Sequence, residues 1–411
     1  MVRTNFRFAI FVGFVFALAL LPGEAQAASL LKLISDRAAL LSFAVCAGLC
    51  MREVGLVRRQ NAFAADIQCF TVFVVSCFAF GLLGFPLAQS VDQPGAVWGG
   101  VVGKFGLASI TQGFARSGAL EIALAAIAAQ AVSGALAERV RLSPLLVFTA
   151  CFSGLVFPIA LSWQSGWLEK IGFIDYAGAT YIHCTAGAAA LAGVMVLGAR
   201  TGRFDPTYTL ESKEHHSFPL AGLGTLILLA GWQGLVTGLL STLPIALSER
   251  VLSRVLLNLD ISAVAGAGVA LIGALVWHRG RVSSVAFNGV IAGLVAISAD
   301  PAHPTLLIAL GIGLVAGALA AVVPLLLERL RLDDVTGAVP AHLCAGAWGT
   351  LAVLVSAPGA RFGTQLEGML AVSAFSFAAA FILFLVLQVL FGLRTNKERL
   401  PPSIASVSSA T

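Results

Sequence analysis

Long, uncharged apolar runs recur along almost the whole sequence and restrict what the chain can fold into. The 411 residues are 58% hydrophobic and only 11% charged, whereas soluble domains carry about 45–50% apolar and about 25% charged residues. The runs are continuous over roughly 20 residues, the length of a membrane-spanning helix, whereas a membrane β-barrel alternates over roughly 10. The sequence therefore predicts an all-α integral membrane protein.

The first 27 residues have the pattern of a secretory signal. Two arginines precede an apolar run over 8–21, and Ala25-Gln26-Ala27 supplies a small-residue cleavage site. We predict cleavage after this site; the alternative is an uncleaved additional helix. The rest of the chain is then a membrane domain over 28–394 and a short polar cytoplasmic tail over 395–411.

After the signal, the hydropathy pattern predicts eleven spans. They lie near 36–51, 62–87, 118–137, 144–163, 176–199, 219–245, 256–277, 284–299, 304–328, 335–357 and 367–393. With the N-terminus outside, most Lys and Arg residues fall in cytoplasmic connections, as the positive-inside pattern requires. This bias accounts for the net charge of +5 without a nucleic-acid partner. We predict a multi-pass bacterial inner-membrane protein with its C-terminus in the cytoplasm.

The seven cysteines all fall inside predicted spans. None lies in an outer loop, where a structural disulfide would form. The chain has no CxxC and no Cys/His spacing typical of zinc, so small buried hydrophobic side chains are the better interpretation. No metal and no other cofactor is predicted.

Two of the six histidines lie deep inside predicted spans. His183 occurs in IHCTAGAAALAG and His342 in AHLCAGAWGTLAV, and both segments share H-x-x-A-G. They belong to the fifth and tenth spans, which cross the membrane in opposite directions. This arrangement is typical of two five-helix halves in inverted repeat, with a site near the midplane between them. A final helix would follow the two halves.

A neutral imidazole costs less inside a membrane than a charged side chain, and it donates from one nitrogen while accepting at the other. Two such rings could form a polar track through an apolar pore for a small permeant and a proton. The alternative is a structural pair that bridges helices by hydrogen bonds. A metal site is less favoured, because no third ligand is evident.

The sequence around both histidines resembles the ammonium transporter (Amt/Rh/MEP) family. DYAGATYIHCTAGAAALAG is similar to the family segment D-[FY]-A-G-G-x-x-x-H-x-x-A-G-x-A-A-L, and LDDVTGAVPAHLCAGAWGTLAV to D-D-x-x-G-A-x-x-V-H-x-x-x-G-x-W-G-T-L. AGLCMREVGLVRRQN, GALAERVRLSP and FNGVIAGLVAISA provide further matches in the family order. The resemblance covers essentially the whole chain after the signal.

The resemblance implies a homotrimer in lipid, with one pore through each eleven-helix subunit. Ammonium would be recruited at an outer vestibule and lose its proton, and ammonia would pass the twin histidines. His183 and His342 match those histidines, Asp175 matches a structural aspartate, and Trp163 matches the vestibule tryptophan that holds a cation. Ser298 stands where the family often has a threonine beside the pore.

The departures from the family concern the outer gate. Leu120 and Leu124 stand where two phenylalanines are usual, Leu235 replaces the aromatic of the gate, and Leu239 replaces a vestibule serine. Leucine has no π face, so a cation gains less there. After the first span, Arg52-Glu53 replaces an aromatic pair. These changes predict a transporter of divergent selectivity.

Three other functions are weighed against ammonium transport. The altered gate is compatible with an ammonium sensor or receptor that transports little, or with a channel for another small amine or gas. A membrane enzyme is disfavoured, because no nucleophile or metal accompanies the histidines. A nitrogen-signalling PII protein is a less favoured partner, because the match to the family tail fades after Lys397-Glu398-Arg399 and Pro401-Pro402 follows.

Overall fold

The computed structural model describes residues 37–89, 118–204, 216–243, 248–277 and 282–395. The predicted signal peptide over 1–27 and almost all of the tail over 395–411 lie outside these ranges. The described residues form helices, and their extended pairing is limited to an isolated bridge between Val140 and Arg394. The all-α prediction is therefore confirmed.

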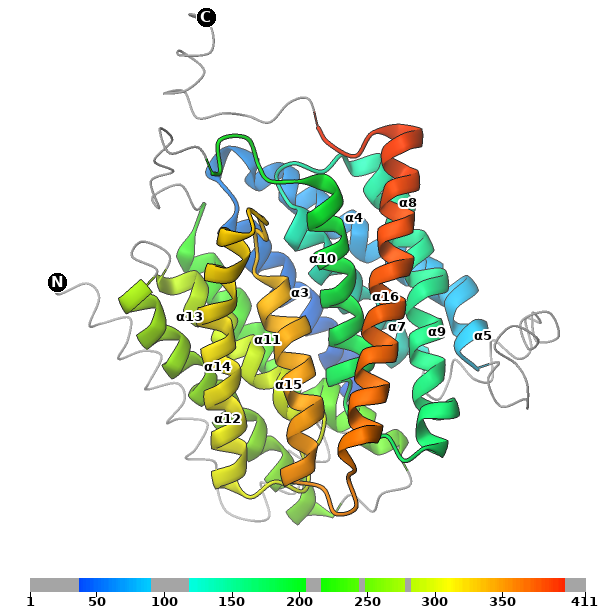
Figure 1. Cartoon of the computed structure of the whole chain (residues 1–411), viewed down its shortest axis with the longest axis vertical. Helices are drawn as coiled ribbons and strands as arrows, with labels where there is room; N and C mark the ends of the chain where they lie inside the picture. The colour runs from blue at the N-terminus through cyan, green and yellow to red at the C-terminus, as the bar shows by residue number, and fades with distance from the viewer. Residues whose placement is uncertain (1–36, 90–117, 205–215, 244–247, 278–281, 396–411) are drawn as a thin grey trace, which may run out of the picture.

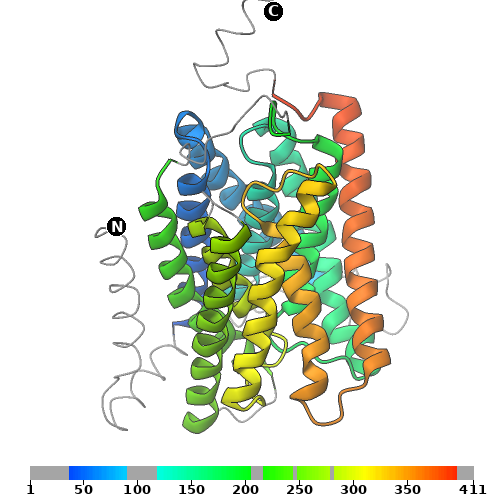
Figure 2. The same cartoon turned by 60° about the vertical axis from the view of Figure 1, so that its left-hand side comes forward.

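The helices stand side by side and form one bundle (Figures 1 and 2). They are α3 (Ala38–Leu56), α4 (Ala62–Ala79), α5 (Phe85–Ala88), α7 (Ala119–Leu136), α8 (Leu142–Cys151), α9 (Phe157–Trp163), α10 (Thr185–Leu197), α11 (Phe218–Thr242), α12 (Glu249–Trp277), α13 (Val282–Ile297), α14 (Leu306–Arg329), α15 (Ala345–Ala352) and α16 (Phe362–Phe391). Single π-helical turns join α4 to α5 and α8 to α9, so each pair makes one long rod.

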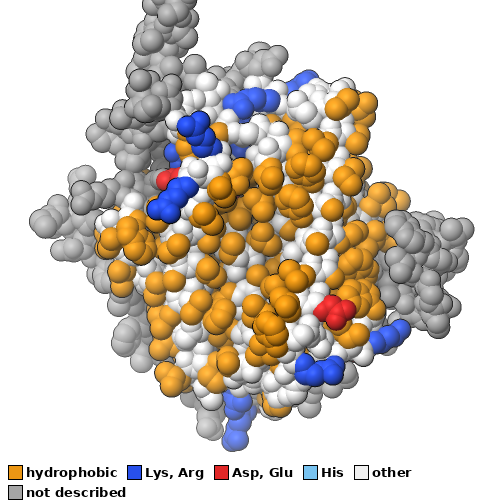
Figure 3. All heavy atoms as spheres, in the orientation of Figure 1, with side chains coloured by type: hydrophobic (Ala, Val, Ile, Leu, Met, Phe, Trp, Pro, Cys, Tyr) orange, Lys and Arg blue, Asp and Glu red, His pale blue; other side chains and the backbone are white. Residues whose placement is uncertain are grey.

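Nine helical rods among the described residues are long and apolar enough to cross a membrane. Two shorter apolar helices, Val282–Ile297 and Val339–Val355, stand at the eighth and tenth predicted spans. Together they correspond to the eleven spans expected from the sequence. Apolar side chains cover the middle of the face seen in Figure 3, with most Lys and Arg side chains near its two ends. A lipid-facing surface requires this distribution.

The first helix differs from its prediction at one end. The sequence predicts a span that stops at residue 51, before Arg52-Glu53, whereas α3 continues to Leu56. Both charged residues are inside the helix and buried, with 4% and 2% of their surface exposed. The prediction placed them outside the span because it assumed that adjacent charges lie in water. The partners of Arg52 come from distant parts of the chain, whereas Glu53 bonds to Gln68 of α4.

The first helices of the two predicted halves, α3 and α11, pack against each other through glycines. A Cβ atom on Gly48 would lie 2.5 Å from the Gly224 carbonyl oxygen, and one on Gly224 would lie 2.6 Å from the Gly48 carbonyl oxygen. Only glycine allows this mutual approach of two backbones, a contact that is typical of membrane helices. The reciprocity agrees with two halves related by inverted repeat.

Candidate functional site

The segment before α10 holds His183 in a helix that starts at an aspartate cap. The Asp175 carboxylate accepts hydrogen bonds from the backbone N–H groups of Gly178, Ala179, Thr180 and Tyr181, at 2.7–3.2 Å. Gly178 has φ +91°, a left-handed conformation that side chains other than glycine rarely adopt. The helix then begins with a π-helical turn, Ala179–Cys184. Four free N–H groups at a helix start explain why a carboxylate is needed there.

The segment before α15 repeats this construction. The Asp334 carboxylate accepts from Gly337, Ala338 and Val339 at 2.8–3.0 Å, and Gly337 has φ +75°. A π-helical turn follows, Val339–Cys344, and contains His342. The spacing from aspartate to glycine to histidine is the same in both segments. The prediction that the fifth and tenth spans correspond is therefore confirmed in the backbone.

The two segments cross at glycines that follow their histidines. A Cβ atom on Gly187 would lie 2.3 Å from the Leu343 backbone nitrogen, and one on Gly346 would lie 2.4 Å from the Ala179 carbonyl oxygen. These distances leave no room for any side chain. The crossing fixes the two π-helical turns against each other, and each turn carries a histidine toward the other.

The two histidine rings meet inside the bundle. The Nδ1 atoms of His183 and His342 lie 3.1 Å apart, and the ring centroids lie 5.1 Å apart. Both residues are buried, with 0% and 3% of their surface exposed. With two nitrogens in contact, one ring donates and the other accepts, so the neutral pair has opposite tautomers. Nε2 of His183 has no hydrogen-bond partner among the described residues and is available to a small polar molecule.

Trp232 of α11 stacks on one ring of this pair. Its ring stacks on His183 with centroids 5.0 Å apart and planes 16° apart. Trp232 Nε1 donates to Ser298 Oγ at 3.0 Å, and Ser298 donates to the Leu294 carbonyl at 2.7 Å. Trp232 was not among the predicted site residues, although an indole in the middle of a span needs a buried acceptor and therefore indicates a polar contact there. Ser298, predicted beside the pore, is thus linked to His183 indirectly: it bonds to the indole of Trp232, which stacks on the His183 ring.

The four predicted gate leucines lie in the main core, whereas the predicted vestibule tryptophan does not. Leu120, Leu124, Leu235 and Leu239 are all buried and belong to one apolar cluster. A Cβ atom on the glycine before Leu239 would lie 3.3 Å from Leu120, so α7 and α11 approach each other here. Trp163 packs in a separate cluster, against Phe375 at 4.8 Å and Trp167 at 5.8 Å between ring centroids.

A small cavity lies beside His342, on the side of Arg52 and Glu53. Arg52 Nη2 donates to Asn288 Oδ1 and to the Thr336 carbonyl. Glu53 accepts instead from Gln68 Nε2 at 3.3 Å. The two charged groups, neighbours in sequence, are therefore held by partners on different helices. Both residues line the cavity.

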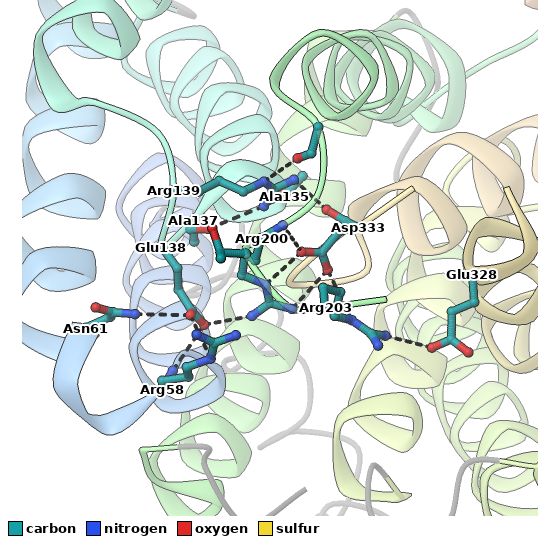
Figure 4. Close-up of polar contacts among 12 residues, drawn as sticks. Arg58, Asn61, Ala135, Ala137, Glu138, Arg139, Arg200, Arg203, Glu328 and Asp333 are labelled. Carbon is teal, nitrogen blue, oxygen red and sulfur yellow. Dashed lines mark hydrogen bonds and ion pairs between the residues drawn. The ribbon is translucent and has the colours of Figure 1, made fainter. Parts of the chain in front are cut away.

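Loops at one end of the bundle are joined by a network of ion pairs (Figure 4). Arg200 contacts Asp333 at 2.7 Å and Glu138 at 2.8 Å, and Glu138 also contacts Arg58 at 3.3 Å. Arg139 donates to the Gly198 and Asp333 carbonyls. We call this end, defined by Arg58, Glu138, Arg139, Arg200 and Asp333, the charged end.

Burial and charge pairing oppose each other in this network. Burial by itself would raise the pKa of Asp333, but the Arg200 guanidinium outweighs it and holds that pKa well below its usual range. Burial likewise favours neutral Arg200, yet Asp333 and Glu138 raise its pKa above the usual value. Asp334, next along the chain, has a raised pKa because burial dominates over its backbone hydrogen bonds. The network therefore stays ionised at neutral pH.

The described residues contain no group of three His, Cys, Asp or Glu side chains that could hold a metal ion. The seven cysteines are unpaired, and three of them, Cys46, Cys69 and Cys184, are fully buried.

Comparisons with known proteins agree with the resemblance. The model of the Ammonium Transporter Family matches residues 34–405. A relative from Synechocystis sp. is 33% identical over 366 residues, covering 86% of this chain and 82% of the relative. Ammonium transporter Amt2 of Archaeoglobus fulgidus is 32% identical over 391 residues, covering 86% and 81%.

Solved structures show the same fold. The structure titled "Sensor Amt Protein" superposes with a TM-score of 0.79 at 28% identity, covering 89% of this chain and 95% of that one. Mep2 of Saccharomyces cerevisiae superposes with a TM-score of 0.74 at 22% identity, covering 91% and 89%. The family match over most of the sequence and the shared eleven-span architecture lead to one conclusion: the chain belongs to the ammonium transporter family, whose members are membrane transporters rather than enzymes.

Proposed function

We propose that the chain moves ammonium across the bacterial inner membrane by passing ammonia along the histidine pair. The observation that carries this proposal is the 3.1 Å contact between the Nδ1 atoms of His183 and His342 inside the bundle. A buried pair with one donor and one acceptor can hold a small neutral amine by hydrogen bonds without a net charge in the membrane. A proton can be passed along the same pair.

The apolar surroundings favour ammonia over the ammonium ion. Leu120, Leu124, Leu235 and Leu239 are buried in the main core, and we propose that they line the outer half of the pore, where an ion would find no replacement for its hydration. Because no gate aromatic faces the cation, recruitment depends on Trp163 alone and is weak. We expect low apparent affinity for ammonium at the outer mouth.

We place the charged end in the cytoplasm, with the N-terminus outside and the C-terminus inside. The Arg residues of the charged end lie in connections between spans, where the positive-inside pattern puts them on the cytoplasmic side. A homotrimer in the lipid bilayer is the assembly that family membership supports. Asp175 is proposed as a structural anchor of the first histidine segment.

The test uses proteoliposomes that contain the purified protein. An inward ammonium gradient should change the internal pH, or carry a current, and the flux should saturate in the wild type. His183→Ala with His342→Ala should lose or alter this flux. His303→Ala is the matched control, because His303 pairs with Asp300 at 2.8 Å and is 41% exposed. No flux from folded wild type would overturn the transport proposal.

Ammonium sensing is the second candidate. The relative whose solved structure is titled "Sensor Amt Protein" is 28% identical, and the leucines at the gate weaken the recruitment that rapid transport needs. Ammonium binding by folded protein without any flux would favour sensing. Flux of methylammonium in preference to ammonium would instead indicate a channel for a different small amine.

A further inference from the structure

The turn before the His183 helix is fixed by two backbone hydrogen bonds. The N–H groups of Tyr176 and Ala177 donate to carbonyls in the connection that follows α13, at 2.9 Å each. These carbonyls belong to Ala299 and Ser298. The helix that carries the first histidine therefore starts from a turn that is anchored to the end of a neighbouring helix.

The corresponding turn of the second histidine segment has a weaker backbone anchor. Counted from the aspartate caps, Val335 stands at the position of Tyr176, and its N–H donates to the Ala135 carbonyl of α7 at 3.3 Å. Thr336 stands at the position of Ala177, and its N–H has no backbone acceptor among the described residues. One long hydrogen bond thus replaces two short ones, so this turn needs another support.

Arg52 provides that support from α3. Its Nη2 atom donates to the Thr336 carbonyl at 2.6 Å and to Asn288 Oδ1 of α13. Asn288 itself lies against the turn, since a Cβ atom on Gly337 would lie 2.0 Å from Asn288 Nδ2. One guanidinium therefore connects a helix of the first half, a helix of the second half and the turn from which the His342 helix starts.

Burial and charge make this support strong. Arg52 is 4% exposed, and a hydrogen bond from a charged donor is roughly twice as strong as one between neutral groups. The neighbouring Glu53 carboxylate accepts from Gln68 of α4, so the guanidinium is directed at the turn. His342 follows in the π-helical turn Val339–Cys344, and a displacement of the start of that helix would be passed on to its ring.

We infer that Arg52 is a positioning residue for the histidine pair: through Thr336 and Asn288 it fixes the start of the His342 helix and so sets the contact between the two rings. The effect on flux rests on the proposed function, whereas the effect on the ring contact does not. Arg52 and Glu53, adjacent in sequence, thus have separate roles, because the guanidinium reaches the second half and the carboxylate bonds within the first.

The ring contact is measured by NMR of the protein with isotope-labelled histidine in lipid nanodiscs. The proton between the two Nδ1 atoms should give a strongly downfield resonance in wild type, and its absence from His342→Ala assigns it. Arg52→Gln removes the charged donor and should abolish this resonance. Arg52→Lys keeps a charged donor for the same two oxygens and should retain it.

Arg58→Gln is the matched control. Arg58 is 7% exposed and pairs with Glu138 at 3.3 Å at the charged end, so its loss also removes a buried arginine from a polar contact. The resonance should persist in this variant. An arginine with a merely structural role would act alike at both positions, and the comparison therefore separates positioning from a general loss of stability.

Ammonium flux into proteoliposomes is the second readout. Per folded protein, Arg52→Gln should lower the flux about tenfold or more, because a misplacement of about 1 Å in a preorganised site can cost about a hundredfold, and Arg52→Lys should restore most of it. If Arg52→Gln does not fold, Asn288→Ala decides by the same resonance, since it removes one of the two oxygens that Arg52 binds. A resonance retained in the folded variant, or absent from wild type, would overturn the inference. Absence of wild-type flux would overturn the proposed function and leave the result on the ring contact standing.

Discussion

His183 and His342 lie in segments with the same backbone construction but different neighbours. Each follows an aspartate cap, a left-handed glycine and a π-helical turn. His183 is completely buried beneath Trp232, whereas His342 borders a cavity with Arg52 and Glu53. The repeated backbone therefore sets where the rings lie, and the unrepeated side chains give each ring its own chemistry.

The segments also differ in how they are attached. The second begins with two aspartates, and Asp333 joins it to Arg200 at the charged end. The first has Ile174 before its aspartate, and that residue bonds through its backbone to Gln365 of α16. The second segment is held by an ion pair, and the first is held by hydrogen bonds to the side-chain amide of Gln365. Substitutions at four places test these differences.

The largest effect is expected at the crossing, which both segments share. Gly187→Ala and Gly346→Ala each place a Cβ atom less than 2.5 Å from a backbone atom of the other segment. Such overpacking forces the backbones apart, so little folded protein should be recovered by size-exclusion chromatography in detergent. Gly268→Ala is the control, because a Cβ there meets nothing within 4 Å. Normal folding of both crossing variants would refute the shared crossing.

The second effect concerns only the second segment. Asp333→Asn removes the charge that faces Arg200 in a pair where the aspartate side chain is 2% exposed. Breaking a buried ion pair leaves an uncompensated charge, so the free energy of unfolding should fall by about 3 kcal/mol. Chemical or thermal unfolding in detergent measures this. Glu328→Gln, at a pair that is 30% exposed on the glutamate side, should change little.

The same pair predicts a dependence on pH. The pKa of Asp333 is lower in the folded protein than its ordinary value of about 3.9. Its contribution to stability is therefore complete above that value and is lost as the pH falls below it. The difference in unfolding temperature between wild type and Asp333→Asn should shrink below about pH 4. A constant difference down to strongly acidic pH would contradict the pairing.

The third effect compares the two caps directly. Asp175 accepts from four backbone N–H groups and Asp334 from three. Asparagine replaces one accepting oxygen with a donor, so each substitution should cost about 1–3 kcal/mol. Asp175→Asn should be the more destabilising of the two in thermal unfolding. Equal costs would mean that the additional hydrogen bond contributes nothing.

The smallest effect is confined to the surroundings of His183. Ser298→Ala leaves Trp232 Nε1 without its acceptor, at a cost of about 1 kcal/mol. Ser298→Thr keeps the hydroxyl and should restore stability. Tryptophan fluorescence provides a second readout, because the indole of Trp232 is completely buried. If Ser298→Ala unfolds like wild type, the hydroxyl does not orient the indole.

Most of the architecture could be predicted because the lipid interior imposes a strong constraint. Continuous apolar runs gave eleven spans, and a shared H-x-x-A-G gave the correspondence of the fifth and tenth. The predicted end of the first span was wrong, because hydropathy places the charged residues Arg52 and Glu53 in water, whereas α3 continues to Leu56. Arg52 bonds to Asn288 and to the Thr336 carbonyl, far away in sequence, and Glu53 bonds to Gln68 of the next span. Local patterns carry no information about such partners.

The sequence predicted those residues of the site that lie in a recognisable motif. His183 and His342 are brought together as expected, at 3.1 Å. Trp232 was missed because its role depends on stacking between helices that no spacing in one sequence reveals. Trp163 as the cation platform stays a prediction, and in the structure its ring packs on Phe375 rather than in the cluster of the gate leucines.

The crossing at Gly187 and Gly346 also decides when the protein can mature during synthesis. The first glycine belongs to the fifth span and the second to the tenth, so the crossing between the two histidine segments cannot form until the tenth span leaves the ribosome. A nascent chain that ends after α14 holds only one of the two histidines. Completion of the histidine pair is thus among the last steps of biogenesis, and separately expressed halves should form it only when they meet in the same membrane.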